Sequence, residues 1–351
     1  MNPVTVDVTC LIRSELTGIG NYCYQLMRAL HNEGQATSYV RKFSRRDPHH
    51  FIEKWTGESA KAYIPYLSDL TTKHKGIFHG PDFKMIVSPL WKRVVTIHDL
   101  AVFHPEWLDP NFCESGQKKM ANVIRKNPDA IIVATDFVAK ELVEYFPKME
   151  GKVHSIFHGG DHLLPVDESE SFAFHEKPYF LYVGTIEKRK NLQNILPAFE
   201  KFVEKNPEFQ LWIVGGDGYG AKDIHRLLLP MEAKGYIKRL GYVNNKKLKA
   251  LYQNAKGLIY PSVYEGYGIP LMEAMSLGCP VVTSHYGSVN EVAGDGALKV
   301  DPLSQNEIET AIETLAFTNQ SERIAKARSR AQKYTWQNSA KEHIKVYKSL
   351  M

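Results

Sequence analysis

Short apolar runs alternate with helical stretches along most of this 351-residue chain. Val4, Val6 and Val8 alternate with polar residues, which is typical of a first strand. The later apolar runs of the first half are at 77–78, 94–97, 131–133 and 153–157, with helical stretches at 112–126 and 137–146. Alternating strands and helices predict a parallel sheet with helices on both faces, and hence an α/β fold.

The same alternation starts again after residue 178. Residues 161–178 lack periodicity and carry an acidic, serine-containing run, so they are the predicted linker. The second series has expected strands at 179–183, 211–214, 237–240 and 258–260, and expected helices at 191–206, 221–234, 245–254, 304–318, 321–334 and 336–350. The chain is also too long for one typical core. We therefore predict two Rossmann-like halves with a cleft between them.

The most informative stretch runs from Tyr260 to Ser284. Gly266 and Gly268 follow a short apolar run, and they allow the backbone to turn and to approach a ligand closely. Pro270 lies where a helix would begin, and Gly278 lies where it would end. Apolar residues between them predict one apolar helix face. A glycine loop that leads into a helix N-terminus is a typical phosphate site.

Two carboxylates, Glu265 and Glu273, flank this glycine loop. Carboxylates accept hydrogen bonds, so the pair suits the hydroxyl groups of a sugar and a ribose. Two carboxylates can also act as acid and base in a glycosidase. Their position beside a predicted phosphate site favours a nucleotide-sugar site over that alternative.

Two adjacent cations, Arg189 and Lys190, follow the first strand of the second half. They lie between a strand end and a helix start, where they would neutralise a diphosphate. A solvated basic turn is the alternative for the run 188–190. The run Gly215–Gly218 follows the next strand and permits either close approach of a ligand or a tight turn.

Further candidates lie in the first half. His98 follows the apolar run 94–97, and ligands of open α/β sheets bind beyond the carboxyl ends of strands. A hydrogen-bonded structural histidine is the alternative. Gly18 and Gly20 open the first helix, as in nucleotide-binding α/β units, although many helices begin with glycine for steric reasons alone.

The composition argues against several classes of protein. A net charge of +5 is too small to indicate nucleic acid as a partner. The four cysteines show no paired spacing, so neither a disulfide framework nor a zinc site is expected. The sequence shows no signal-peptide pattern and no apolar run of bilayer length. We therefore expect a cytoplasmic protein whose membrane association, if any, is peripheral.

One local basic cluster could contact anionic lipid head groups at the inner face of a membrane. A solvated basic loop is the favoured alternative, because basic clusters are usually exposed. The cluster comprises Arg41, Lys42, Arg45 and Arg46 around Phe43, followed by Phe51 and Trp55.

Together these motifs resemble the retaining glycosyltransferases of family 4. The segment from Glu265 to Glu273 resembles the Glu-x7-Glu element of that family. The resemblance is strong from 179 to 302 and looser before that range. The other motifs that carry it are Gly-Thr-Ile-Glu-Lys-Arg-Lys-Asn at 184–191, Gly-Cys-Pro-Val-Val-Thr-Ser at 278–284, Ser-Val-Asn-Glu-Val-Ala-Gly at 288–294, Asp301-Pro302, Gly18-Ile-Gly20 and Ile97-His98-Asp99.

The resemblance implies the GT-B fold, in which two Rossmann-like domains face each other across a deep cleft. Residues 1–164 would form the acceptor domain, and residues 165–334 would form the donor domain. A C-terminal helix at 335–351 would cross back to the first domain.

The resemblance also implies roles for matching residues of the second half. Glu273 would hold the ribose of the donor, and Glu265 would hold the transferred sugar. Arg189 and Lys190 would bind the diphosphate. Many members of the family have Arg where this chain has Thr185, so Arg189 would have to supply that charge here.

In the first half, Gly18 and Gly20 would close over the diphosphate, and His98 would lie near the sugar and the acceptor. The implied catalytic residues are therefore His98, Arg189, Lys190 and Glu265. The implied donor-binding residues are Gly18, Gly20, Gly184, Arg189, Lys190, Gly215, Asp217, Tyr242, Val243, Glu265, Gly266, Tyr267, Gly268, Ile269, Leu271 and Glu273.

The implied reaction moves a hexose, with retention, from a nucleotide sugar to a saccharide or lipid-linked saccharide. The wording of the motifs most resembles bacterial mannosyltransferases of surface-polysaccharide and lipopolysaccharide assembly, which implies GDP-mannose as donor. Rhamnosyl, glucosyl and N-acetylglucosaminyl transfer stay open. No Asp-x-Asp pair ends a strand, so neither a metal nor another cofactor is expected. No carboxylate is an obvious nucleophile, which favours front-face attack.

Three alternatives share such a scaffold or such a cleft. A sugar-nucleotide epimerase would act without an acceptor. A glycan phosphorylase would consume phosphate, and one that uses pyridoxal phosphate would need a dedicated lysine that the sequence does not reveal. A non-catalytic sugar-binding protein of the periplasmic kind is disfavoured by the lack of a signal-peptide pattern.

Overall fold

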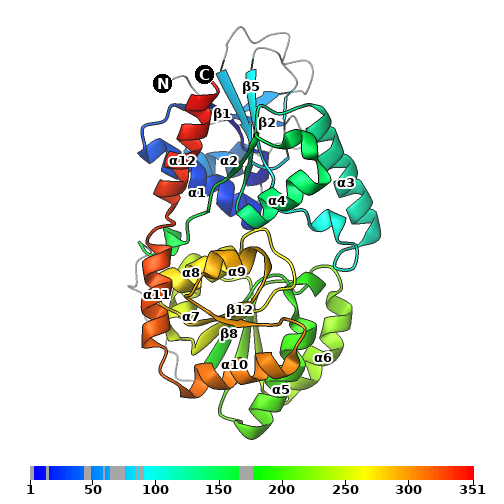
Figure 1. The fold of residues 1–351 in the computed structure, drawn as a ribbon. Helices are drawn as coiled ribbons and strands as arrows, with labels where there is room; N and C mark the ends of the chain where they lie inside the picture. The colour runs from blue at the N-terminus through cyan, green and yellow to red at the C-terminus, as the bar shows by residue number, and fades with distance from the viewer. Residues whose placement is uncertain are drawn as a thin grey trace. The chain divides into compact units, whose positions relative to one another are not determined.

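The structure is a computed structural model that describes residues 4–12, 16–42, 49–57, 60–63, 76–83, 85–86, 91–165 and 177–351. The chain divides into two compact units (Figure 1). Unit 1 contains Met1–Leu100, Glu114–His158 and Trp336–Met351, and unit 2 contains Ala101–Cys113 and Gly159–Thr335. Two segments before residue 165, Ala101–Cys113 and the beginning of the expected linker, thus pack with the second half of the chain.

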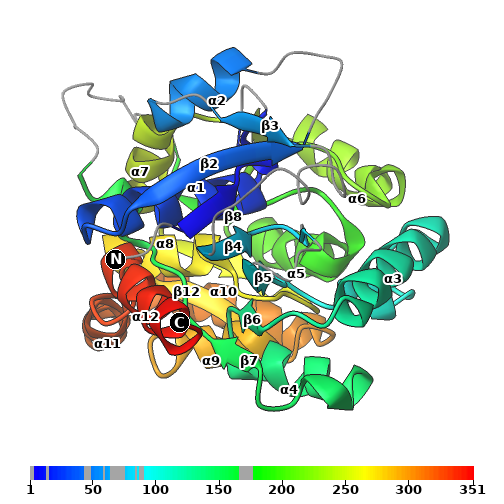
Figure 2. The ribbon, with the colours of Figure 1, turned by 90° about the horizontal axis from the view of Figure 1, so that it is seen from above.

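Unit 1 is built on a seven-stranded sheet in the order β3-β2-β1-β4-β5-β6-β7. All of its strand pairs are parallel, which confirms the predicted α/β class. Figure 2 shows β4 to β7 side by side, with α4 next to β7. The strands are β1 (Val4–Asp7), β2 (Thr37–Lys42), β3 (Lys61–Tyr63), β4 (Gly76–Gly80), β5 (Trp91–Thr96), β6 (Ala130–Val133) and β7 (Val153–Ser155).

The helices of this part of the chain are α1 (Gly18–Asn32), α2 (His49–Thr56), α3 (Pro110–Arg125), α4 (Asp136–Tyr145) and α12 (Trp336–Ser349). Thr17 caps α1, because its hydroxyl accepts a hydrogen bond from the backbone N–H of Gly20. The C-terminal helix α12 packs on α1 and shares its apolar core (Figure 1). Trp336 and Tyr347 are the largest apolar side chains that α12 contributes to that core.

A chain of buried hydrogen bonds connects α12 to the sheet. The Nδ1 atom of His343 lies 2.7 Å from the carbonyl oxygen of Ser339, which can only accept. His343 therefore donates from Nδ1, and its Nε2 atom accepts when the ring is neutral. The hydroxyl of Tyr22 lies 3.0 Å from that Nε2 and donates to it, so it accepts from Thr96 Oγ1 at 3.0 Å.

The donors and acceptors of the remaining hydrogen bonds follow from these assignments. Thr96 Oγ1 accepts from His79 Nε2 at 2.8 Å, and His79 Nδ1 accepts from the hydroxyl of Tyr347 at 2.7 Å. Burial lowers the pKa of both histidines, and it lowers the pKa of His343 to about 4. The carbonyl of Ser339 thus determines the tautomers of His343 and His79. Each ring accepts a hydrogen bond on one nitrogen, so both rings must be uncharged.

Unit 2 is built on a six-stranded parallel sheet in the order β10-β9-β8-β11-β12-β13. Its strands are β8 (Tyr179–Val183), β9 (Gln210–Val214), β10 (Ile237–Gly241), β11 (Gly257–Tyr260), β12 (Val281–Ser284) and β13 (Leu298–Val300). Its helices are α5 (Leu192–Lys205), α6 (Ala221–Ala233), α7 (Asn245–Asn254), α8 (Ile269–Leu277), α9 (Gly287–Ala293), α10 (Gln305–Phe317) and α11 (Ser321–Ala331). Helices α5, α6 and α10 form one apolar core with the sheet.

Helix α8, which the sequence singled out, is largely buried. Gly268 precedes it with a φ of 95°, Pro270 lies in its first turn, and Gly278 ends it with a φ of 76°. The apolar residues that were predicted to form its buried face are all buried, and the charged Glu273 is buried with them. The helix is surrounded by α7, α9, α11 and the sheet, so no broad solvent-facing side remains.

The predicted basic surface at 41–46 is corrected in one respect. Arg41 lies in β2, an inner strand of the sheet, and its side chain is buried, so it cannot belong to a lipid-facing surface. Trp55 is partly buried against Tyr24, with ring centroids 5.4 Å apart. Residues 43–48 and the side chain of Phe51 lie outside the described residues.

In the part of the chain that the structure describes, no helix is both long and apolar enough to cross a bilayer.

Candidate active site

The predicted cationic run forms a short 3-10 helix, Lys188–Lys190, between β8 and α5. Asn191 ends this turn with a φ of 70°, and its side chain is fully buried. Its Nδ2 atom donates to the carbonyl oxygens of Pro261 at 2.8 Å and Pro302 at 2.6 Å. The backbone N–H of Val263 also donates to the carbonyl of Arg189. These bonds hold the cationic turn against the loop that follows β11.

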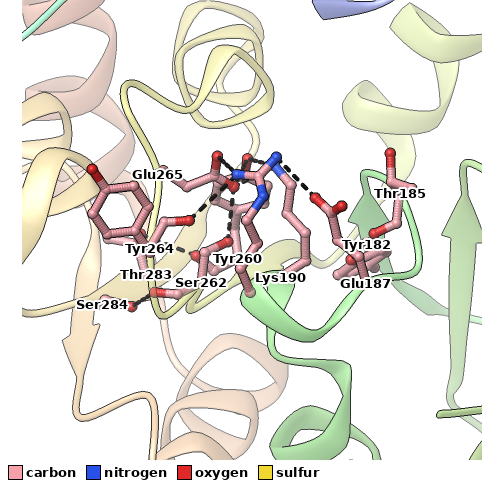
Figure 3. A network of polar contacts seen from close by, with 11 residues as sticks. Tyr182, Thr185, Glu187, Lys190, Tyr260, Ser262, Tyr264, Glu265, Thr283 and Ser284 are labelled. Atoms are coloured by element: carbon pink, nitrogen blue, oxygen red, sulfur yellow. Dashed lines mark hydrogen bonds and ion pairs between the residues drawn. The ribbon is translucent and has the colours of Figure 1, made fainter. Parts of the chain in front are cut away.

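Glu265 lies in that loop and accepts hydrogen bonds on both carboxylate oxygens (Figure 3). Its Oε1 atom accepts from Lys190 Nζ, from the hydroxyl of Tyr260 at 2.8 Å and from Ser262 Oγ at 3.2 Å. Its Oε2 atom accepts from Arg189 Nη1 at 2.9 Å. The structure therefore brings together Arg189, Lys190 and Glu265, three of the four predicted catalytic residues.

The charges of this cluster are balanced. Glu187 lies 2.8 Å from Arg189 Nη2, so two carboxylates face two cations. Burial opposes ionisation of Glu265, but the charges of Lys190 and Arg189 outweigh it and lower the pKa of Glu265 to about 2. Glu265 is thus an ionised carboxylate at neutral pH, and it is held in place by the cations.

The loops that follow β8 and β9 lie so close together that a side chain would not fit at two of the glycines after β9. A Cβ atom on Gly215, whose φ is 135°, would lie 2.1 Å from the carbonyl oxygen of Gly184. A Cβ atom on Gly218 would lie 2.6 Å from Thr185 Cγ2. The turn residue Asp217 pairs with the next helix, since its Oδ2 atom lies 2.9 Å from His225 Nε2. The contacts within the chain thus account for two of these glycines without any ligand.

Glu273 is buried in α8, and both of its carboxylate oxygens are also bonded. His162 Nε2 lies 3.0 Å from Oε1, and the hydroxyl of Tyr252 lies 2.8 Å from Oε2. Burial and the adjacent carboxylate raise the pKa of Tyr252 well above its ordinary value, so Tyr252 donates in this bond. Both partners lie outside α8, one on α7 and one in the segment after β7.

That segment, Gly160 to Leu164, packs directly against α7 and α8. Ser276 Oγ shares its proton between the carbonyls of Gly160 at 2.9 Å and Glu273 at 2.8 Å. Lys249 Nζ donates to the carbonyl of Leu164 at 3.1 Å. A Cβ atom on Gly160 would lie 2.6 Å from the backbone of Met272. Part of the expected linker is therefore a packed element of unit 2.

We expect Gly160→Ala to lower the free energy of unfolding of unit 2 by about 1–3 kcal/mol, because a rigid backbone contact must open to admit the methyl group. Urea unfolding followed by circular dichroism measures this change. Gly216→Ala is the matched control, because no heavy atom of the described residues lies within 4 Å of its Cβ position. Equal stabilities of the two variants would contradict the prediction.

Three other predicted residues, Gly18, Gly20 and His98, belong to unit 1, and their roles toward a donor stay predictions. His98 Nε2 lies 2.7 Å from the carbonyl oxygen of Pro81, and burial lowers the pKa of His98. Its ring also meets that of Tyr22 edge-on at 4.9 Å.

The remaining predicted donor residues line the loops of unit 2. Tyr242 follows β10 and is 59% exposed, and the next residue, Val243, is buried. Tyr267 is buried, and burial raises its pKa well above the ordinary value. Gly266 and Gly268 are buried in the same loop, Ile269 is partly buried, and Leu271 is fully buried.

Sequence reasoning missed the partners of both carboxylates. Glu187 stands two residues before Arg189, so its charge next to a cation was a usable signal. His162 lies 111 positions before Glu273, and no periodicity or motif connects the two.

Among the described residues, no group of three or more His, Cys, Asp or Glu side chains is arranged to hold a metal ion.

Comparisons with known sequences agree with the motifs. The model of the family "Glycosyl transferases group 1" matches residues 166–335. O-antigen chain mannosyltransferase B of Escherichia coli is 31% identical over 286 residues, which is 78% of this chain and 74% of that protein. O-antigen chain mannosyltransferase RfbU of Salmonella typhimurium is 25% identical over 64% of this chain and 61% of its own length.

Solved structures show the same fold at low identity. Sucrose-phosphate synthase from Thermosynechococcus elongatus has a TM-score of 0.74 at 19% identity and covers 100% of this chain and 99% of its own. WaaG, a glycosyltransferase involved in lipopolysaccharide biosynthesis, has a TM-score of 0.70 at 13% identity and covers 98% of this chain and 99% of its own. These neighbours confirm the predicted GT-B fold. The chain therefore belongs to the group 1 glycosyltransferases, and it is a glycosyltransferase enzyme.

Proposed function

We propose that this enzyme transfers mannose, with retention of configuration, from GDP-mannose to a saccharide or lipid-linked saccharide acceptor in surface-polysaccharide assembly. The mannosyl donor is supported by the named activities of the relatives from Escherichia coli and Salmonella typhimurium. The observation that carries the proposal is the cluster of Arg189, Lys190 and Glu265 in unit 2.

In this proposal Arg189 and Lys190 stabilise the departing diphosphate. The hydrogen bonds of Asn191 and Glu265 hold both cations at the end of β8. Charges placed in advance stabilise a developing anion without reorganisation during the reaction. The N-terminus of α8 adds a positive dipole end. Because the two cations and the helix N-terminus offer hydrogen-bond donors to the diphosphate, we propose that transfer needs no metal, and activity should then survive EDTA.

The bonding of Glu265 supports a front-face reaction. A double-displacement mechanism needs a carboxylate nucleophile. Both oxygens of Glu265 accept bonds from cations, and its pKa of about 2 makes it a weak base. We therefore propose that the acceptor attacks on the face that the diphosphate leaves, and that the phosphate takes the acceptor proton. A trapped covalent glycosyl-enzyme would contradict this mechanism.

A donor panel tests the proposal directly. Purified enzyme is incubated with GDP-mannose, UDP-glucose, UDP-N-acetylglucosamine or dTDP-rhamnose, with and without a mannose-terminated lipid-linked acceptor, and release of nucleoside diphosphate is measured. We expect release from GDP-mannose only when the acceptor is present. Turnover of a nucleotide sugar without acceptor would instead favour an epimerase. A requirement for inorganic phosphate would favour a phosphorylase.

Glu273→Ala is expected to raise the KM for the donor about 10- to 100-fold, because hydrogen bonds to a charged group contribute about 1.5–3 kcal/mol. The KM for the acceptor should stay unchanged if Glu273 contacts only the ribose. Initial rates measured over both substrate concentrations separate the two constants. An unchanged donor KM would contradict the ribose assignment.

A further inference from the structure

We propose that His162 is a positioning residue of the donor site, which orients the carboxylate of Glu273 toward the ribose of the donor. This inference rests on the proposed function, because it takes Glu273 as the group that holds the ribose. It also assigns a binding role to part of the segment that the sequence marked as a linker.

Each oxygen of the Glu273 carboxylate has its own partner, which restricts the orientation of the carboxylate. His162 donates to Oε1 at 3.0 Å, and Tyr252 donates to Oε2 at 2.8 Å. A carboxylate has about four lone-pair sites, so each oxygen keeps capacity for a second donor. With one lone pair of each oxygen occupied, the remaining lone pairs of the carboxylate have defined directions. The carboxylate is thus prepared to accept two neighbouring hydroxyls, such as the 2′ and 3′ hydroxyls of a ribose.

The position of His162 is set independently of Glu273. The carbonyls on either side of it, at Gly160 and Leu164, accept hydrogen bonds from α8 and α7. Leu163 is fully buried, so the short 3-10 helix that carries His162 cannot turn away. The side chain of His162 is 2% exposed and that of Glu273 is 6% exposed. A buried carboxylate that lost this donor would adopt another rotamer or take up water.

The experiment compares a normal ribose with one that lacks the hydroxyls in question. Binding of GDP and of 2′,3′-dideoxy-GDP is measured by calorimetry for the wild type and for His162→Phe, which keeps an aromatic ring without the donor. We expect the wild type to bind GDP about 10- to 100-fold more tightly than the dideoxy compound. In His162→Phe this ratio should fall to within about threefold.

A merely structural role for His162 predicts a different result. Loss of local packing would weaken both ligands equally and leave the ratio as in the wild type, and that outcome would overturn the inference. His162→Gln supplies an amide N–H at a similar reach, so it should restore most of the ratio. His285→Phe is the matched control, because His285 is an exposed histidine of unit 2 with no assigned contact to Glu273. Its ratio of GDP affinity to dideoxy-GDP affinity should equal that of the wild type.

The panel also separates this inference from the proposed function. If the wild type did not bind GDP, the proposed GDP-mannose donor would fail, and the inference would fail with it. If the wild type bound GDP and the dideoxy compound equally well, Glu273 would not hold the ribose, and the inference would fail while the proposed donor stood. If the wild type bound GDP and discriminated against the dideoxy compound, but His162→Phe discriminated equally well, only the role of His162 would be refuted.

Discussion

Lys190→Ala should reduce turnover by a factor of about 100 to 1,000, which is the usual effect of losing one group that stabilises transition-state charge. Lys190 lies beside Arg189 and contacts the same carboxylate, so its loss removes one of two cations from the proposed diphosphate site. Release of nucleoside diphosphate under saturating donor measures the effect on kcat. A variant with the wild-type rate would show that Lys190 does not contact the diphosphate.

The same substitution should also destabilise unit 2. Removing one partner of a buried ion pair costs about 3–5 kcal/mol when the other charge is left uncompensated. Glu265 keeps Arg189 as a partner, so we expect a smaller loss of about 1–3 kcal/mol. The double variant Lys190→Met, Glu265→Gln removes both charges and should recover most of that loss without recovering turnover. Lys188→Ala changes a lysine of the same turn whose Nζ lies over the ring of Tyr219, 5.7 Å from its centroid. This control should retain the wild-type rate and stability.

Acidification from pH 6.5 to pH 4 should lower the free energy of unfolding of unit 1 by about 3 kcal/mol through His343 alone. The pKa of His343 is about 4 in the folded chain, below its ordinary value of 6.5. Between these pH values the unfolded state binds more protons, so stability falls as the pH falls. His79 adds to the loss in the same direction, because burial lowers its pKa too.

Denaturant unfolding at pH 7, 6, 5 and 4 measures this dependence. His343→Gln removes the titrating ring and should be less stable than the wild type at pH 7. Its stability should then change less between pH 6.5 and 4. His31→Gln is the control, since His31 is exposed and should follow the wild-type curve. If His343→Gln lost stability as steeply as the wild type, the buried chain of hydrogen bonds would not explain the acid sensitivity.

Local patterns were sufficient for the elements and for part of the site. The alternation of apolar runs with helices predicted both parallel sheets, because side-chain periodicity follows directly from backbone geometry. Gly268, Pro270 and Gly278 marked the ends of α8, since each has a backbone preference of its own. Arg189 and Lys190 could be recognised because they are adjacent in the sequence and follow a predicted strand.

The tertiary structure decided what those residues touch. The sequence did not predict that the carboxylate of Glu265 binds the two cations in the folded chain, and its role toward the sugar stays a prediction. The run Gly215–Gly218 was predicted to permit either a ligand or a tight turn, and in the fold Gly215 lies against the carbonyl of Gly184, while its role toward the donor stays a prediction. Arg41 was placed on a basic surface, and it is buried in β2.

The sequence by itself therefore determined the α/β class, the boundaries of the helices around the site and the family to which the chain belongs. Only the tertiary structure placed His162 on Glu273 and connected α12 to the sheet through Tyr22, His79 and His343. Backbone preferences act over a few residues, so they can be read from a short segment. These contacts of His162, Tyr22 and His79 join residues more than a hundred positions apart, so they depend on the packing of distant segments, which a local pattern does not specify.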